Sequence, residues 1–146
     1  MKALYLLSAF VVGALLPVQV GVNSALGRLV GKPLLAALTN FVVGIVALSA
    51  LAVAMGQVQG TGNLRGAPWW LFVGGLIGAS VVVSGVVVAP KLGGALFFAA
   101  IVAGQLAAGL LLDHLGAFGL RHAPISPGRV LGVAAVLAGV YMIHRS

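Results

Sequence analysis

The sequence contains no cysteine, no glutamate and only one acid, Asp113. The absence of cysteine excludes disulfides, thiolate nucleophiles and cysteine metal ligands. One carboxylate and three histidines that are not clustered offer neither a metal-ligand set nor the nucleophile and base of an enzyme. We therefore expect no catalytic residues, no metal and no cofactor.

Charge of either sign is scarce. Charged residues make up 6% of the chain and hydrophobic residues 62%, with a mean hydropathy of +1.22. A soluble domain of this composition would expose more apolar surface than water tolerates, so the chain is predicted to be a multi-pass membrane protein. A net charge of +7 would suggest nucleic acid in a soluble protein. Here the basic residues flank apolar segments, so their expected partner is membrane lipid.

Long charge-free segments predict the membrane spans. A helix needs about 20 largely apolar residues to cross a bilayer. The last segment is the shortest, but Ser126 is a suitable N-cap and Pro127 suits the first helical position. The sequence predicts an all-α integral membrane bundle in one domain, residues 1–146, with five helices at 3–26, 34–55, 69–89, 92–112 and 127–144.

Pairs of small residues four positions apart predict close helix packing. Gly74 and Gly78 form such a pair in the third predicted helix. In a chain with 22 glycines several pairs arise by chance, so they support a bundle without identifying a dimer surface.

The basic residues fall equally on the two sides of the membrane. With five spans, one side carries Lys2, Arg65, Arg121 and Arg129. The other side carries Arg28, Lys32, Lys91 and Arg145. The side with more Lys and Arg normally stays in the cytoplasm, so a four-to-four balance predicts insertion in both orientations and an antiparallel homodimer. The alternative is a fixed orientation set by something finer than this count.

Four sequence segments carry a family resemblance. They are VQVGVNSALGRLVGKPLLAALTNFVVG, PWWLFVGGLIGAS, VAPKLGGALFFAAIVAGQLAAGLLLDHLG and ISPGRVLGVAAVLAGVYMI. The most specific parts are the Q-x-x-x-N of the first helix and the GQ-x₆-LDH-x-G of the fourth. The chain resembles the YdcZ (DUF606) family of the drug/metabolite transporter superfamily. This resemblance implies a five-helix bacterial inner-membrane transporter, related to small multidrug resistance exporters and EamA-type carriers.

The small multidrug resistance exporters use a carboxylate in the first helix, and this chain lacks it. At the matching depth it has Pro17, Gln19 and Asn23, which are neutral at physiological pH. Simple proton–cation antiport on a first-helix carboxylate is therefore not expected.

Four amides at membrane depth are the candidate substrate-binding residues. Gln19 and Asn23 share one helix face, and Asn40 and Gln105 lie in the second and fourth spans. Amides offer both donors and acceptors, so a cavity that they line would suit a small polar or weakly cationic solute. The alternative role is hydrogen bonding between helices. Pro17, which removes a backbone hydrogen bond, is a candidate hinge.

Asp113 and His114 follow at the end of the fourth span. At partial depth Asp113 could take part in ion coupling or gating. The alternative is a hydrated residue at the membrane boundary that pairs with Arg121 or Arg129.

The expected function is secondary transport by alternating access. In the antiparallel dimer both copies would contribute Gln19 and Asn23 to a cavity near the pseudo-two-fold axis. The alternative is a non-transporting assembly subunit, or one half of a heterodimeric transporter.

Overall fold

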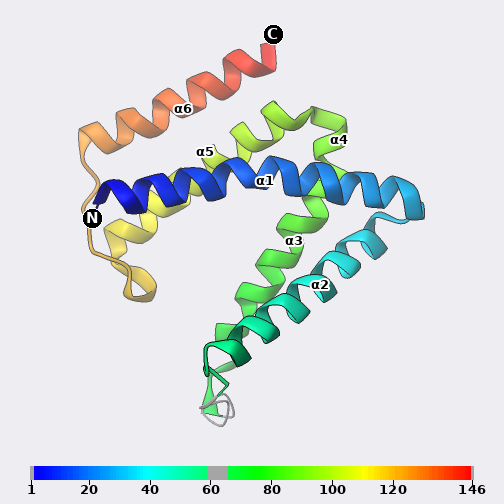
Figure 1. Cartoon of the computed structure of the whole chain (residues 1–146). Helices are drawn as coiled ribbons and strands as arrows, with labels where there is room; N and C mark the ends of the chain where they lie inside the picture. Colours follow the sequence, from blue (N-terminus) through cyan, green and yellow to red (C-terminus); the bar gives the residue numbers. More distant parts are fainter. Residues whose placement is uncertain (1, 59–65, 146) are drawn as a thin grey trace. The chain divides into compact units, whose positions relative to one another are not determined.

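The computed structural model describes residues 2–58 and 66–145, and within these ranges it is helical with no strand. Arg65, one of the residues in the charge count, lies outside the described residues. The elements, shown in Figure 1, are α1 (Lys2–Val30), α2 (Pro33–Ala54), η2 (Trp69–Phe72), α3 (Val73–Val87), α4 (Ala89–Leu92), α5 (Gly94–Leu115), η3 (Ala117–Gly119) and α6 (Pro127–Arg145).

The prediction of five apolar helices of membrane-spanning length is confirmed. In the described part of the chain five helical segments are long and apolar enough to cross a membrane: Ala3–Val30, Pro33–Ala54, Trp69–Val87, Gly94–Leu115 and Pro127–Arg145. The shortest predicted span forms a full helix that begins at Pro127, and the N–H of Arg129 donates to the Ser126 hydroxyl at 3.4 Å. Ser126 therefore caps α6 as predicted.

The helix ends depend on backbone turns rather than on charges. α1 continues through Arg28 to Val30, beyond the predicted end at residue 26. Gly31 follows with φ +66°, a left-handed conformation that glycine adopts without strain, and Pro33 starts α2. α5 likewise runs past residue 112 to Leu115 and ends at Gly116, with φ +59°. At the C-terminal ends of α1 and α5 the hydropathy boundary thus lies before the end of the helix.

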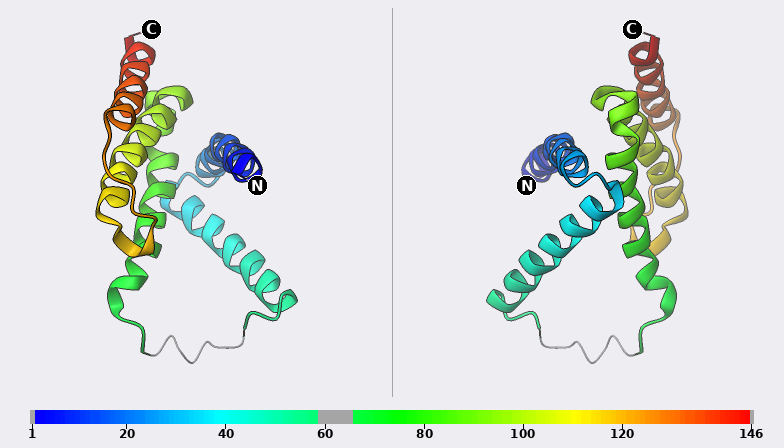
Figure 2. Two further views of the ribbon diagram at one scale, coloured as in Figure 1. Left: turned by 90° about the vertical axis from the view of Figure 1, so that its left-hand side faces the viewer. Right: turned by 90° about the vertical axis from the view of Figure 1, so that its right-hand side faces the viewer.

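The chain forms two compact units, residues 1–91 and 92–146. In the first unit α1, α2 and α3 pack against one another. α1 and α2 meet at the turn around Gly31 and diverge from it (Figure 2). In the second unit α5 packs against α6, and residues 116–126 join the two helices.

Small residues form the core of the first unit, where its three helices meet. The buried residues of this unit are Asn23, Ser24 and Gly27 on α1, Ala36 and Ala37 on α2, Gly85 and Val86 on α3, and Ala89 on α4. A Cβ on Gly27 would lie 3.0 Å from Val86 Cγ1, and one on Gly85 would lie 2.9 Å from Val20 Cγ2. Both glycines thus allow α1 and α3 to approach more closely than any side chain would permit.

Candidate functional site

Gln19 and Asn40, two of the four predicted amides, line one cavity of about 340 Å³ in the first unit. Gln19 lies in the middle third of α1, and Asn40 lies about two turns into α2. Val82 of α3 and Phe41 and Leu48 of α2 add apolar wall. The structure therefore brings two amides from two candidate membrane spans to one mainly apolar cavity.

The chemistry of this cavity is that of neutral hydrogen-bonding groups. None of the described residues that line it is charged. The side chains of Gln19 and Asn40 make no hydrogen bond to any described residue, and neither is buried. An amide without a hydrogen-bond partner is costly in an apolar environment. These two side chains can therefore gain hydrogen bonds from a ligand or from a second subunit.

Asn23 lies one turn beyond Gln19 in a different environment. It is 4% exposed, next to the equally buried Ser24, in the small-residue core of the first unit. It is not among the residues that line the Gln19–Asn40 cavity. Pro17 lies within α1, which continues as a helix on both sides of it. The roles of Asn23 in substrate binding and of Pro17 as a hinge stay predictions.

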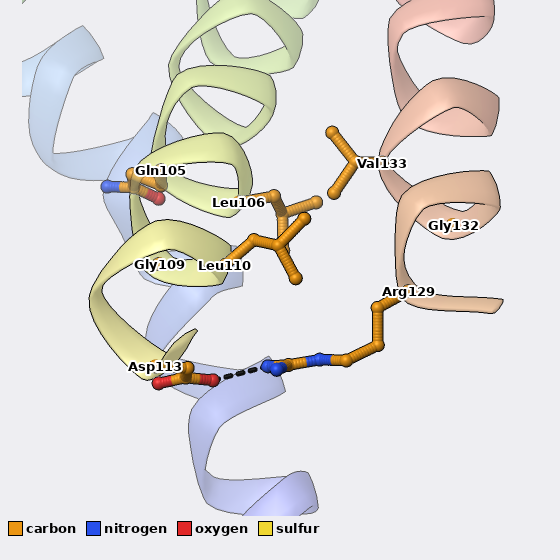
Figure 3. Close-up of a pocket in the computed structure, with 8 residues that line it drawn as sticks. All are labelled: Gln105, Leu106, Gly109, Leu110, Asp113, Arg129, Gly132 and Val133. Carbon is orange, nitrogen blue, oxygen red and sulfur yellow. Dashed lines mark hydrogen bonds and ion pairs between the residues drawn. The ribbon is translucent and has the colours of Figure 1, made fainter. Parts of the chain in front are cut away.

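Gln105 belongs to the second unit and lines another cavity there, of about 410 Å³. Leu106 and Leu110 of α5 extend toward Val133 of α6 and form its apolar wall (Figure 3). Asp113 and Arg129 lie at one end of this cavity, and Figure 3 shows the Gln105 amide well apart from them.

Asp113 forms an ion pair with Arg129, one of the two partners that the sequence allowed. The Arg129 guanidinium donates to the Asp113 carboxylate and, at 2.6 Å, to the Ala123 carbonyl. The N–H of Ala123 in turn donates to the Asp113 carbonyl at 2.9 Å. Both side chains are about two-thirds buried, with relative exposures of 32% for Asp113 and 35% for Arg129. These bonds hold the 116–126 segment against the end of α5.

His114 supports the same segment. Its Nδ1 accepts the N–H of Ile125 at 3.4 Å, and its ring stacks on His122 with centroids 6.5 Å apart. The loop is thus bound by the His114 side chain and by the Asp113 backbone carbonyl, whereas the Asp113 side chain binds Arg129 at the start of α6.

A third cavity, of about 460 Å³, was not anticipated as a site. It lies in the first unit and its lining includes Ser24, Arg28 and Lys91. The sequence analysis used Arg28 and Lys91 only to count basic residues on each side of the membrane. The available signal was the spacing of Ser24 and Arg28, which places both on one face of α1.

Comparisons with known proteins agree with this architecture. A family model described as "Putative inner membrane exporter, YdcZ" matches residues 4–142. The inner membrane protein YdcZ of Escherichia coli (strain K12) is 29% identical over 113 residues, which cover 77% of this chain and 75% of the relative. No solved structure gives a significant match. With five spans and a family match over nearly its whole length, the chain belongs to the YdcZ family of multi-pass inner-membrane proteins.

Proposed function

We propose that the chain is a secondary transporter that exports a small polar or weakly cationic solute, and that Gln19 and Asn40 bind it. The observation that carries this proposal is the cavity that these two amides share on different helices. Family membership supports export, and the amides in the cavity support a polar solute.

The class of solute follows from the lining. Two amides offer donors and acceptors to N–H and O–H groups, and their oxygens tolerate a weakly cationic group. A strong anion would find no positive charge among the described lining residues. The apolar wall of Phe41, Leu48 and Val82 leaves room for a short hydrocarbon portion.

The transport mechanism that we propose uses two copies in opposite orientations. The equal charge count supports dual insertion, and many transporters place their binding site between inverted repeats near the membrane midplane. Gln19 is exposed in one copy and lies in the middle third of α1, where a second copy can complete its hydrogen bonding. Rocking of the two copies then opens the cavity to each side in turn, with Pro17 as a hinge in α1.

The Asp113–Arg129 pair is the proposed gate in this mechanism. It connects α5 to the first turn of α6 and to Ala123 of the loop between them. Breaking the ion pair would release the end of α5 and the start of α6 from each other. Loss of the Arg129–Ala123 hydrogen bond alone would leave these two helix ends joined. His114, which contacts Ile125, would move with the same segment.

The experiment measures solute uptake by inverted membrane vesicles from expressing cells. The vesicles are given a defined mixture of amino acids, amino alcohols and amino sugars, and the accumulated components are measured by mass spectrometry. We expect Gln19→Ala and Asn40→Ala each to lower the uptake of the transported component about tenfold, the effect of about one lost hydrogen bond. Gln57→Ala is the matched control, because Gln57 is an amide outside the cavity.

Dimer assembly is measured on the same variants in native gels. Reduced uptake with an intact dimer supports solute binding. Loss of the dimer would instead support a role in helix packing. Uptake equal to that of Gln57→Ala would contradict the site, and the absence of any accumulated component with the unmodified protein would contradict the polar class of solute.

A further inference from the structure

The cavity between the end of α1 and the α3–α4 junction contains two cations that have no acid to pair with. Its lining includes Arg28 on α1 and Lys91 on α4. Asp113 is the only acid in the sequence, and it already pairs with Arg129 in the other unit. No side-chain carboxylate is therefore left for Arg28 or Lys91.

Helix packing brings these two cations to one cavity. Ser24 and Arg28 lie one turn apart on α1, so they share a face with Gly27 between them. Gly27 packs directly against Val86, where α1 contacts α3. Lys91 follows Val87 by one turn and lines the same cavity. The cavity thus borders the small-residue core and the turn at Gly31 between α1 and α2.

The chemistry of the lining favours an anion with an apolar portion. Arg28 can bind a phosphate through two parallel N–H donors, Lys91 adds a second positive charge, and the Ser24 hydroxyl can donate a hydrogen bond. Pro33, Val86 and Val87 make the remaining wall apolar. The carbonyl end of α1 opposes an anion with about half a negative charge, which two full positive charges outweigh.

We propose that this cavity binds a phosphate group, either in the headgroup of an anionic membrane lipid or in a soluble phosphorylated anion. The apolar wall and the place of Arg28 near a helix end match a lipid whose headgroup contacts the cations and whose chain lies along the helices. The site is independent of the proposed solute cavity, because the two cavities share no lining residue.

The test compares two double variants that remove equal charge from the same predicted side. Arg28→Gln with Lys91→Gln removes both cations of the cavity. Lys32→Gln with Arg145→Gln removes two cations that do not line it. Both variants leave a basic-residue count of four to two across the membrane, so their effects on orientation match.

Binding is measured by native mass spectrometry of the purified protein in micelles that contain phosphatidylglycerol or phosphatidylcholine with the same acyl chains. We expect the unmodified protein and the control to prefer phosphatidylglycerol, and the cavity variant to bind it about 30-fold more weakly, the effect of two lost cations near a membrane surface. Equal weakening in both variants would overturn the proposal.

A second titration distinguishes the two sources of phosphate. Inorganic phosphate is added to lipid-free micelles of each protein and the heat of binding is measured. Heat that the cavity variant lacks supports a soluble anion, and phosphatidylglycerol preference without such heat supports a lipid. If the unmodified protein shows neither, the proposal is wrong.

A measurement on the unmodified protein covers the case in which the cavity variant does not fold. Lysine acetylation is followed by mass spectrometry at Lys91, with Lys32 as the internal control. Phosphate bound in the cavity slows acetylation at Lys91 more than at Lys32 when phosphatidylglycerol or inorganic phosphate is added. Equal rates at both lysines under both additions would contradict the site.

Discussion

At the scale of single residues, missing side chains determine how the first unit packs. Gly27 and Gly85 lie at contacts between α1 and α3 that leave no room for a side chain. Gly74 and Gly78, the pair with the recognisable spacing, are different: among the described residues, no neighbouring atom lies within 4 Å of the position that a Cβ would take on either glycine. The spacing of small residues therefore does not show which of them form the contact.

Substitution of Gly85 by alanine should destabilise the protein. The added Cβ would lie 2.9 Å from Val20 Cγ2, and the branched valine side chain is too stiff to move away easily. We expect a loss of about 1–3 kcal/mol in the free energy of unfolding, as for overpacked cores. Unfolding in mixed detergent micelles measures it. Gly78→Ala is the matched control and should unfold like the unmodified protein; equal stability of the two variants would contradict the proposed contact.

At the scale of elements, the 116–126 segment is held by the ends of the helices that it joins. Arg129 bonds to both Asp113 and Ala123, and His114 accepts the N–H of Ile125. Ion pairs that water reaches contribute up to about 1 kcal/mol, so this partly buried pair alone does not explain how the segment is held. The ion pair holds the loop only together with the hydrogen bonds that Ala123 makes to Arg129 and to the Asp113 carbonyl.

Removal of the Asp113 carboxylate should loosen this segment without unfolding the helices. In Asp113→Ala the guanidinium of Arg129 loses its ionic partner, and the loop retains only single hydrogen bonds to the end of α5. We expect faster amide hydrogen exchange in residues 116–126, by several-fold, with unchanged helix content by circular dichroism. The control is Arg121→Ala, which removes a charge from the same loop but no described bond. Unchanged exchange in Asp113→Ala would argue against a gate at this position.

At the scale of the whole molecule, the balance of basic residues governs orientation. Four basic residues on each predicted side predict that the chain inserts with no preferred orientation. The described residues contain five candidate spans, an odd number, so the two ends of the chain are expected on opposite sides of the membrane. One label at the C-terminus therefore reports the orientation of the whole chain.

A single cysteine added after Ser146 tests dual insertion, because the chain has no other thiol. An impermeant thiol reagent should label about half of the protein from each side of the membrane. Adding Lys32→Gln and Arg145→Gln leaves an excess on the N-terminal side and should move the C-terminus outward. Labelling from one side only, in the chain with the added cysteine alone, would rule out the antiparallel homodimer.

The membrane class, the five spans and the cap of α6 follow from the sequence alone. Hydropathy and capping depend on neighbouring residues, so they can be read without knowledge of the fold. The single acid also limited the ion pair to one carboxylate, and the sequence reduced its partners to Arg121 or Arg129.

Only the tertiary structure decided which of these residues meet. Gln19 and Asn40 share a cavity, Asn23 is buried one turn away, and Gln105 lies in the second unit. The physical reason is that contact between helices depends on their rotation and crossing, which for α1 and α3 are limited by the fit at Gly27 and Gly85. Membrane helices associate through such packing rather than through a hydrophobic pattern, so hydropathy locates each helix but does not predict its partners.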